Sequence, residues 1–581
     1  MLRYLLTGQH LGDRSTGATM NDMQTVRRVR PPHRPAVHAR HPLLSASALL
    51  VTLACAGALA AGIWLRLWLV LHVALDSDEA VVGLMAEQVL HGHFSAFYWG
   101  QSYGGVEPLL AAAGLAVLGH SGYALNATAA TLDLVACALV AVLARVAGAG
   151  RAAAAVAASL AWLWPFSAVW NSTRELGFRQ ATLVLGLLLL VLAVSIVRRG
   201  GGPVRWSLLG LVGGVGWWAS PEIAYFAVPA AGLLAWELVR RQARATVVRV
   251  AAAVAAFGVG ALPWLVDNVQ RGFASLSAAG VGGTTHGTYL HRLHVAFVDM
   301  APMQLGLRAP TSGRWVTATT PAVALCVAAA VVVVAGMVGL WWRGPRPGRV
   351  LVAAVVAFPF LYAAFPPTDY WIDGRYALYF GPLLALVAVM GGALLLQALP
   401  RPGPGAGRRW LRTSAAVAVL AAGALSTAAG LGTTYPHADR SPGTTPVANA
   451  VTRQLVGALA AHHLTTVVAG YWVAYDVDFL SHQTITATPV GPIRVPADER
   501  AVAPSRHAAW LFVQPTAAGR RAVLAQFGSA LPVPFAMPLQ QFTGLLEAWH
   551  IDFRTVPVGP MVAVVPRAPA GALMARIAHA L

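Results

Sequence analysis

The chain has 581 residues, of which 57% are hydrophobic and only 11% are charged, so the composition excludes an ordinary soluble protein and predicts one that a lipid bilayer accepts. The formal net charge is +19, and all 41 residues in the combined lysine and arginine count are arginine. These arginines cluster between apolar runs, as they do in the loops of membrane proteins, which disfavours nucleic-acid binding.

The first predicted element is a polar tail at residues 1–43, which we interpret as disordered and cytoplasmic, with Met20 or Met23 an equally good start. The apolar run at 43–75 is too long for the core of a cleaved signal peptide and is the first predicted spanning helix. Cys55, Cys137 and Cys326 all lie inside apolar runs, which argues against a disulfide framework or a metal cluster. Ten further runs give eleven spanning helices in total: 123–144, 152–170, 181–197, 206–219, 222–239, 247–266, 319–342, 350–366, 376–399 and 412–432.

The distribution of arginine predicts the orientation of these helices. If the N-terminus is cytoplasmic, the inner loops hold most of the arginines, and the first outer loop, residues 76–122, holds none. The inner set is Arg145, Arg151, Arg198, Arg199, Arg205, Arg240, Arg241, Arg244, Arg249, Arg343, Arg346, Arg349, Arg401, Arg408, Arg409 and Arg412. The outer set before residue 433 is Arg174, Arg179, Arg271, Arg292, Arg308, Arg314 and Arg375. This asymmetry predicts a cytoplasmic N-terminus and an extracytoplasmic C-terminus in the plasma membrane.

Two outer loops and a C-terminal domain complete the predicted organisation. Loop 76–122 contains two amphipathic stretches, 80–90 and 108–118, which we expect to form short helices on the membrane surface. The second long outer loop is 268–318. From residue 433 the hydropathy falls, and 433–581 is predicted to be an extracytoplasmic α/β domain. Its expected helices are 447–462, 517–527 and 540–549, and its expected strands are 465–470, 484–489 and 508–513, with a closing hairpin at 553–565.

Three carboxylates stand directly after the first helix, at Asp76, Asp78 and Glu79. Crowded carboxylates raise each other's pKa, which suits one of them to proton abstraction near neutral pH. The alternative is that they cap the helix that follows, with Asp76 or Ser77 as the cap. Both roles are compatible with one sequence, so the segment is a candidate catalytic site and a candidate helix start.

The segment containing Asp78, Glu79 and Ala80, followed by the block at 98–105 and by Glu107, resembles the first outer loop of GT-C glycosyltransferases. These membrane enzymes take sugars from polyprenyl-phosphate carriers and include the protein O-mannosyltransferases and the lipid A aminoarabinose transferases. The segment 373–379 resembles the Arg-Tyr motif that opens a late helix in many members, and 470–481 resembles the C-terminal domain of some bacterial relatives. The loop departs from the mannosyltransferase pattern in having Tyr103-Gly104-Gly105 where a Pro-Pro pair is common.

The resemblance implies a GT-C-like polytopic α-helical fold, with a catalytic module at 44–432 and an inverting sugar transfer. Asp78, with Glu79 beside it, matches the catalytic base, which would deprotonate an acceptor hydroxyl. The leaving phosphate needs positive charge, which arginine supplies in a bidentate manner. The candidates for binding it are Arg375 with its neighbour Tyr376, together with Arg174 and Arg179. The alternative roles are a pair of Arg375 with Asp369 or Asp373, and a pair of Arg174 with Glu175 or Glu222.

Other residues are candidates for contacts with the substrate: Asp76, Tyr103, Glu107, Glu222, Tyr471 and Trp472. For Glu222 the alternative is a charge in the first turn of a helix that Ser220 caps. For Tyr471 and Trp472 it is a place in the core of the C-terminal domain. Asp133 lies within the second helix, where it either lines a donor cavity or, as we favour, pairs with a buried arginine or hydroxyl.

No cofactor is assigned from the sequence, and participation of a divalent cation is left open. The outer-loop histidines His91, His93, His286, His291 and His294 offer ligand spacing at 291 and 294, but solvated side chains are the favoured interpretation. The predicted partners are a polyprenyl-phosphate-linked sugar, a glycan, lipid or protein acceptor, and membrane lipid. Two other functions stay open: a transporter or flippase of lipid-linked glycans, and an envelope scaffold without catalytic activity.

Overall fold

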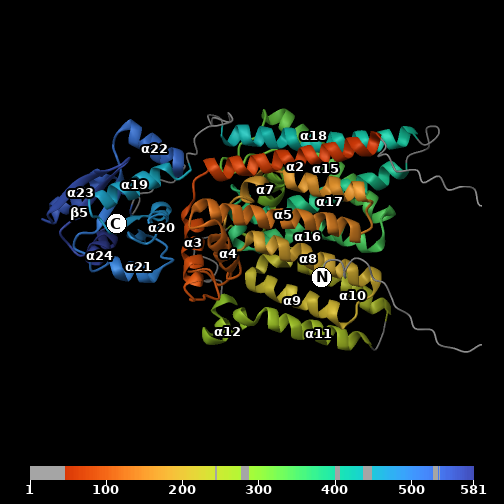
Figure 1. The fold of residues 1–581 in the computed structure, drawn as a ribbon, viewed down its shortest axis with the longest axis horizontal. Coiled ribbons are helices and arrows are strands. Elements are labelled where there is room, and N and C mark those ends of the chain that lie inside the picture. The colour runs from red at the N-terminus through yellow and green to blue at the C-terminus, as the bar shows by residue number, and fades with distance from the viewer. Residues whose placement is uncertain are drawn as a thin grey trace, which may run out of the picture. The chain divides into compact units, whose positions relative to one another are not determined.

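The computed structural model describes residues 46–241, 245–276, 287–398, 406–435, 448–527, 534 and 537–580, and residues 46–581 form one compact unit. The predicted tail at 1–43 and His286 lie outside the described residues. Most of the described chain is helical, and its long apolar helices pack side by side in one bundle (Figure 1).

Eight described helical segments are long and apolar enough to cross a membrane, so the chain is an integral membrane protein. They contain α2 (Ala46–His72), α5 (Gly122–Val146), α8 (Arg179–Arg199), η1 with α10 (Pro221–Ile223, Ala224–Arg241), α15 (Thr319–Arg343), η5 with α16 (Arg346–Gly348, Arg349–Ala364), α17 (Phe380–Ala398) and α18 (Ala406–Thr434). A ninth would be α11 (Ala245–Gly260) with α12 (Leu262–Gln270), which meet at a bend of 62°.

The remaining two predicted runs are helical but short of spanning length. The run at 152–170 divides into α6 (Arg151–Leu163) and α7 (Phe166–Asn171), because Pro165 between them cannot continue a helix. The run at 206–219 forms α9 (Pro203–Ala219). Glycine lets α9 approach α11 closely: a Cβ atom at Gly210 would lie 1.9 Å from the carbonyl oxygen of Ala253. All eleven predicted runs are therefore helical, while the described residues supply eight or nine spans.

The two short helices predicted in the first loop are present as α3 (Ser77–Leu90) and α4 (Glu107–Leu118). They pack on each other at the end of the bundle that also carries α20 (Tyr471–Leu480), as Figure 1 shows. A separate apolar core joins them to α20, with Val82 and Met85 from α3 packed with Phe479 from α20. Further short elements are η2 (Ala274–Leu276), α13 (Tyr289–Val295), η4 (Ala296–Met300), α14 (Ala301–Gln304), η6 (Pro366–Asp369) and η7 (Arg375–Ala377).

The C-terminal segment contains a five-stranded sheet in the order β2-β1-β3-β5-β4. Strands β1 (Thr466–Gly470), β2 (Thr486–Val490) and β3 (Ala509–Val513) are parallel, whereas β5 (Met561–Pro566) is antiparallel to β3 and to β4 (Phe553–Val558). The helices are α19 (Ala450–Ala461), α20, α21 (Pro496–Val502), α22 (Ala517–Phe527), α23 (Leu539–Ala548) and α24 (Ala570–Ala580). Every predicted strand is present, and α20, α21 and α24 are helices that the sequence did not predict.

Candidate active site

The start of α3 is built by a reciprocal capping interaction. The Asp76 carboxylate accepts a hydrogen bond from the backbone N–H of Glu79 at 3.1 Å, and Glu79 Oε2 accepts one from the backbone N–H of Asp76 at 2.9 Å. This capping box satisfies two backbone donors that a helix start otherwise leaves open. The capping role predicted for Asp76 is present, and Glu79 is the other half of it.

Arg174 closes this cluster from the segment that follows α7. Its Nη2 forms a very short contact with Asp76 and lies 2.9 Å from Glu79 Oε2, while its guanidinium stacks 4.6 Å from the ring centroid of Trp170. Glu79 Oε1 accepts a further bond from the backbone N–H of Glu175 at 3.1 Å. The ion-pair alternative for Arg174 is therefore present with different partners, Asp76 and Glu79 in place of Glu175 or Glu222.

Burial governs the ionisation of Glu79, whose side chain is only 1% exposed. Removal from water raises the pKa of Glu79 to about 8; Arg174 acts against this shift, and the nearby charge of Asp76 adds to it. The predicted effect of crowded carboxylates is seen at this residue, although burial is the larger cause.

Asp78 lies between Asp76 and Glu79 in the sequence but contacts different residues. Its Oδ2 lies 3.3 Å from Nη1 of Arg375, and its Oδ1 accepts a hydrogen bond of 2.6 Å from the hydroxyl of Tyr471. The Asp78 side chain keeps 22% of its surface exposed. Asp78 is thus a paired carboxylate that still reaches open space.

The pKa of Asp78 moves in the opposite direction to that of Glu79. Burial raises it, but Arg375, the Tyr471 hydrogen bond, Arg494 and Arg179 together bring the pKa of Asp78 below its ordinary value. The expectation that crowding raises the pKa of these acids is wrong for Asp78, because positive groups outnumber carboxylates around it. Asp78 is an anion at neutral pH.

A tight turn before η7 delivers Arg375 to this place. Gly374 adopts φ +74°, a left-handed conformation that glycine accepts readily, and Asp373 Oδ1 accepts a hydrogen bond of 3.0 Å from the backbone N–H of Arg375. Arg375 Nε also lies 2.8 Å from Asp373 Oδ2. The expected pair with Asp373 is thus present together with a pair to Asp78, whereas Asp369 lies 3.0 Å from His291.

Arg179, at the start of α8, is a buried cation with unused hydrogen-bonding capacity. Its guanidinium lies 4.3 Å from the ring centroid of Phe178 and 4.6 Å from that of Tyr376, and its Nε has no partner among the described residues. Tyr103 packs edge-on against Phe178 at 4.8 Å. Arg179, Tyr376 and Tyr103 therefore form one group, which several sequence segments contribute.

Glu222 interacts with the charges of Arg179 and Arg375, two cations that also act on Asp78. Its Oε2 accepts a very short hydrogen bond from the hydroxyl of Tyr379, and its backbone N–H donates to Ser220 Oγ at 3.1 Å. The predicted capping role of Ser220, with Pro221 as the first residue of η1, is confirmed.

Glu107 begins α4, where its Oε2 accepts a 3.5 Å bond from the backbone N–H of Ala181. Burial raises its pKa to about 7, while hydrogen bonds and Arg179 lower it.

Trp472 packs edge-on against Tyr471 at 5.0 Å. Asp133 forms a buried pair with Arg66 at 2.6 Å, the arrangement favoured by the sequence. In the part of the chain that the structure describes, His, Cys, Asp and Glu side chains form no group of three suited to a metal ion.

Sequence reasoning missed Arg494, which lies between β2 and α21. Its Nε donates to the Tyr471 hydroxyl at 3.4 Å, its Nη1 donates to the carbonyl oxygen of Gly100 at 3.1 Å, and it stacks 5.6 Å from the ring centroid of Tyr98. Tyr98 in turn donates from its hydroxyl to the carbonyl oxygen of Asp78 at 3.2 Å. The resemblance at 470–481 ends before residue 494, so no sequence signal indicated this arginine.

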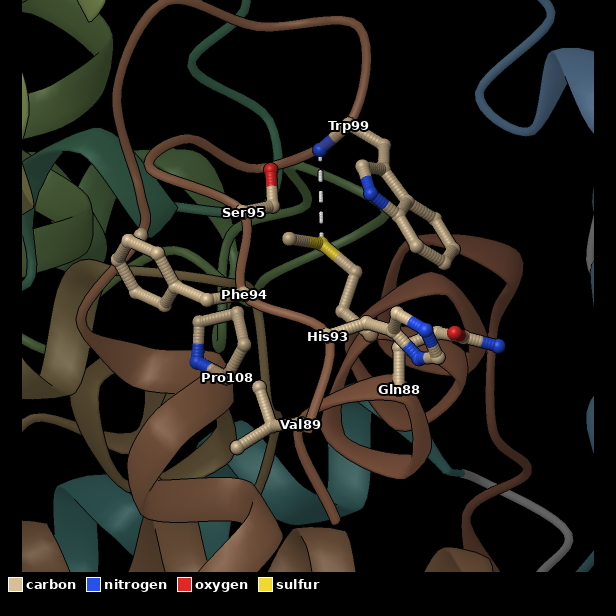
Figure 2. Close-up of a pocket in the computed structure, with 9 residues that line it drawn as sticks. Gln88, Val89, His93, Phe94, Ser95, Trp99 and Pro108 are labelled. Atoms are coloured by element: carbon tan, nitrogen blue, oxygen red, sulfur yellow. Dashed lines mark hydrogen bonds between the residues drawn. The ribbon is translucent and has the colours of Figure 1, made fainter. Parts of the chain in front are cut away.

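A separate pocket of about 90 Å³ lies between the second half of α3, the start of α4 and the loop that joins them (Figure 2). Phe94, Trp99 and Pro108 supply much of its apolar wall, and the backbone N–H of Trp99 points at the sulfur of Met85 at 3.4 Å. Its lining includes neither a carboxylate nor a guanidinium. The pocket is therefore distinct from the Asp78 cluster.

Two solved structures of ArnT from Cupriavidus metallidurans match nearly the whole chain. The one bound to undecaprenyl phosphate has a TM-score of 0.53 at 12% identity and covers 89% of this chain and 98% of that one. The apo form has a TM-score of 0.54 at 13% identity, covering 91% and 99%. The chain has the ArnT fold.

This likeness confirms the predicted fold class, a polytopic helical membrane module with a C-terminal α/β domain. The oligosaccharyltransferase of Archaeoglobus fulgidus in its apo form also matches, with 14% identity, coverage of 76% of this chain and 64% of that one, and a TM-score of 0.44. No protein-family model matches the sequence, and no curated protein matches it. The likeness to ArnT is therefore a likeness of fold.

Proposed function

We propose that this protein is a membrane glycosyltransferase that moves a sugar from a polyprenyl-phosphate carrier to an acceptor hydroxyl, with inversion at the anomeric carbon. The observation that carries the proposal is the Asp78 cluster: an ionised, partly exposed carboxylate lies 3.3 Å from Arg375, at the end of a bundle with the ArnT fold. A proton acceptor and a cation for phosphate are the two groups that this transfer requires.

The donor would bind through its phosphate at Arg375 and Arg179. Arg375 has Asp78 and Asp373 as partners and keeps 16% of its side-chain surface exposed, and Arg179 has a buried Nε without a partner among the described residues. Tyr376 stacks on both guanidinium groups, at 4.6 Å from Arg179 and 5.7 Å from Arg375, and so holds them in one place. An ArnT structure contains undecaprenyl phosphate, which supports a carrier of this chemical class.

The reaction itself is a displacement at the anomeric carbon. The acceptor oxygen forms a bond to that carbon while the bond from carbon to the phosphate oxygen breaks. The acceptor proton passes to Asp78, and the polyprenyl phosphate leaves with one more negative charge than it had as a diester. Arg375 and Arg179 stabilise this added charge, because a guanidinium interacts more strongly with a phosphate monoester than with a diester.

Phosphate binding also prepares Asp78 for its role as base. In the free protein, Arg375 helps to lower the pKa of Asp78. A donor phosphate that binds Arg375 competes for its positive charge, so the pKa of Asp78 rises toward the pH at which a base works best. The ion pair between Asp78 and Arg375 is, in this proposal, the resting state of the site.

Glu79, Asp76 and Arg174 support this geometry in our proposal without contacting the sugar. The capping box fixes the first turn of α3, and Arg174 anchors that turn to the segment after α7. Arg174 is thereby committed to two carboxylates, which leaves Arg375 and Arg179 as the better candidates for the phosphate.

We infer that the reaction takes place on the outer face of the plasma membrane. The inner-loop arginines among the described residues, such as Arg145, Arg198 and Arg343, lie at the ends of spanning helices or in the loops that join them, whereas loop 76–122 has none. Positive loops favour the cytoplasmic side. The acceptor would then be an envelope glycan, lipid or protein that carries a hydroxyl.

The test uses purified full-length protein in lipid vesicles with a radiolabelled polyprenyl-phosphate sugar and envelope extract as acceptor. We expect label in the acceptor fraction, joined with the anomeric configuration opposite to that of the donor. Counterflow of the intact lipid-linked sugar across the vesicle without transfer would instead support the transporter. The described residues contain one bent helix pair, α11 with α12, where a transporter with paired broken helices would have two.

A further inference from the structure

The C-terminal domain reaches Asp78 through a side chain at the end of its first strand. Tyr471 begins α20 directly after β1, and its hydroxyl donates to Asp78 Oδ1 at 2.6 Å, although the two residues are 393 positions apart. Arg494 donates from Nε to the same hydroxyl at 3.4 Å. A chain of two hydrogen bonds therefore runs from Arg494 through Tyr471 to the carboxylate.

Arg494 is held by contacts with both the first loop and the C-terminal domain. Its Nη1 bonds the carbonyl oxygen of Gly100 in the first loop, and its backbone N–H donates to the hydroxyl of Tyr475 on α20 at 2.6 Å. It also stacks over Tyr98. A side chain with contacts to both segments keeps a defined position, so it can orient the group to which it donates.

The helices that carry Tyr471 and Asp78 are also packed tightly together. Ser77 Oγ donates to the carbonyl oxygen of Tyr471 at 2.6 Å. A Cβ atom at Gly83 of α3 would lie 2.5 Å from Cε2 of Phe479 on α20, which shows how closely the two helices approach. The bond between Tyr471 and Asp78 therefore belongs to an extended contact between the two helices.

We propose that Tyr471 and Arg494 are positioning residues for Asp78, which fix the direction of its carboxylate and favour its ionised form, so that the C-terminal domain takes part in the reaction. This inference rests on the proposed function, in which Asp78 is the base. A hydroxyl that donates to a carboxylate stabilises the charged form, and the positive charge of Arg494 strengthens that donation. The other titratable or charged groups around Asp78 are Arg375, Arg179, Tyr98, Asp76 and Asp373.

The test is the pH dependence of kcat/KM for the full-length Tyr471→Phe variant, which loses the hydroxyl and keeps the ring. Without that donor the ionised carboxylate is less stable, its pKa rises, and the acidic limb of the profile moves to higher pH. We expect a shift of about one pH unit, a tenfold change in the ionisation constant. Arg494→Gln should move the limb in the same direction by less, and Arg494→Lys should restore part of the change.

Tyr123→Phe is the matched control. Tyr123 of α5 accepts a hydrogen bond of 2.9 Å from Nη2 of Arg453 on α19, so this variant removes the same chemical group from another contact between the C-terminal domain and the bundle. Its acidic limb should stay where it is in the unmodified protein. Equal shifts in both variants would show general loosening of the contact and would overturn the positioning role.

A second measurement does not depend on sugar transfer. A hydrophobic carbodiimide modifies protonated carboxyl groups, and the Asp78 side chain is 22% exposed, so its labelling can be followed by mass spectrometry as the pH changes. The pH of half-labelling should be higher in Tyr471→Phe than in the unmodified protein. An unchanged half-labelling pH overturns the inference even if transfer is observed. A shifted one shows that Tyr471 favours the ionised form of Asp78 even if transfer fails, in which case the proposed function is lost and with it the part of the C-terminal domain in the reaction.

Discussion

Two ion-pair clusters arise from four consecutive residues, and they differ in what surrounds them. Asp76 and Glu79 bind Arg174 in a cluster where the Glu79 and Arg174 side chains are 1% and 9% exposed. Asp78 binds Arg375 in a cluster where the two side chains are 22% and 16% exposed. Glu79 and Arg174 in the first cluster are nearly closed to solvent, although Asp76 at its edge keeps 28% of its side-chain surface exposed. In the second cluster both partners stay partly exposed.

Helix geometry explains the difference. The capping box uses the residue before the first turn and the third residue of the helix, Asp76 and Glu79, and turns both side chains toward the backbone. Asp78 is the second residue of the helix and projects in another direction, toward Arg375 and Tyr471. The comparison teaches that one acidic segment can anchor a helix with two of its carboxylates and present the third for chemistry.

The largest expected effect is the loss of sugar transfer when Asp78, in the second cluster, is replaced. Asp78→Asn keeps the size of the side chain but cannot accept the acceptor proton, so sugar transfer should fall by roughly 10²- to 10⁴-fold. The thermal unfolding temperature should change little. Transfer of label from the lipid-linked sugar measures the activity, and a melting curve in detergent measures the unfolding temperature. Undiminished transfer by Asp78→Asn would remove Asp78 as the base.

Arg174→Ala tests whether the first cluster, Asp76 and Glu79 with Arg174, stabilises the fold. It removes the cation that pairs with Asp76 and the donor that faces the buried Glu79 side chain, and a buried acceptor left without its donor costs about 1–3 kcal/mol. We expect a lower unfolding temperature and less folded protein, with an unchanged KM for the donor in the fraction that folds. A variant of normal stability with a raised donor KM would instead place Arg174 at the phosphate, as the sequence first suggested.

Arg375→Lys tests whether Arg375, the partner of Asp78 in the second cluster, binds the donor phosphate. Lysine keeps the charge but not the planar fork, so kcat/KM for the donor should fall by roughly 10- to 100-fold, the value of a charge-assisted hydrogen bond. Arg308→Lys is the control, because Arg308 is as exposed as Arg375, at 17% against 16%, and pairs with Asp299 at 3.4 Å. Equal losses in both variants would argue against a specific phosphate contact at Arg375.

A further expected effect, measured on stability alone, is a pH dependence that originates in Glu79. Its pKa is raised from 4.5 to about 8 in the folded protein, so the folded state holds a proton that the unfolded state releases. Stability should therefore decline as the pH rises from about 5 to 8, by about 1.4 kcal/mol for each unit of pKa difference that persists. Glu79→Gln should reduce this slope. A slope identical in both proteins would assign the effect to other buried acids, such as Glu107 and Glu175.

The local patterns of the sequence predicted much of this structure correctly. The apolar runs are all helices, loop 76–122 contains its two short helices, and the predicted strands of the C-terminal domain are present. The cap at Asp76 and the pair of Asp133 with a buried arginine were also predicted. The number of spans was less certain from sequence, because Pro165 divides one run and another forms only the 17 residues of α9.

By itself, then, the sequence determined most of the helices, the strands, and where acids and arginines gather, because periodicity, capping and hydropathy act over a few neighbouring residues. Only the tertiary structure decided that Arg174 binds Asp76 and Glu79, that Arg375 binds Asp78, and that Arg494 supports the site. Those pairings join segments far apart in the chain. Their partners are selected by the packing of α3 against α20 and of the bundle helices, which no local pattern records.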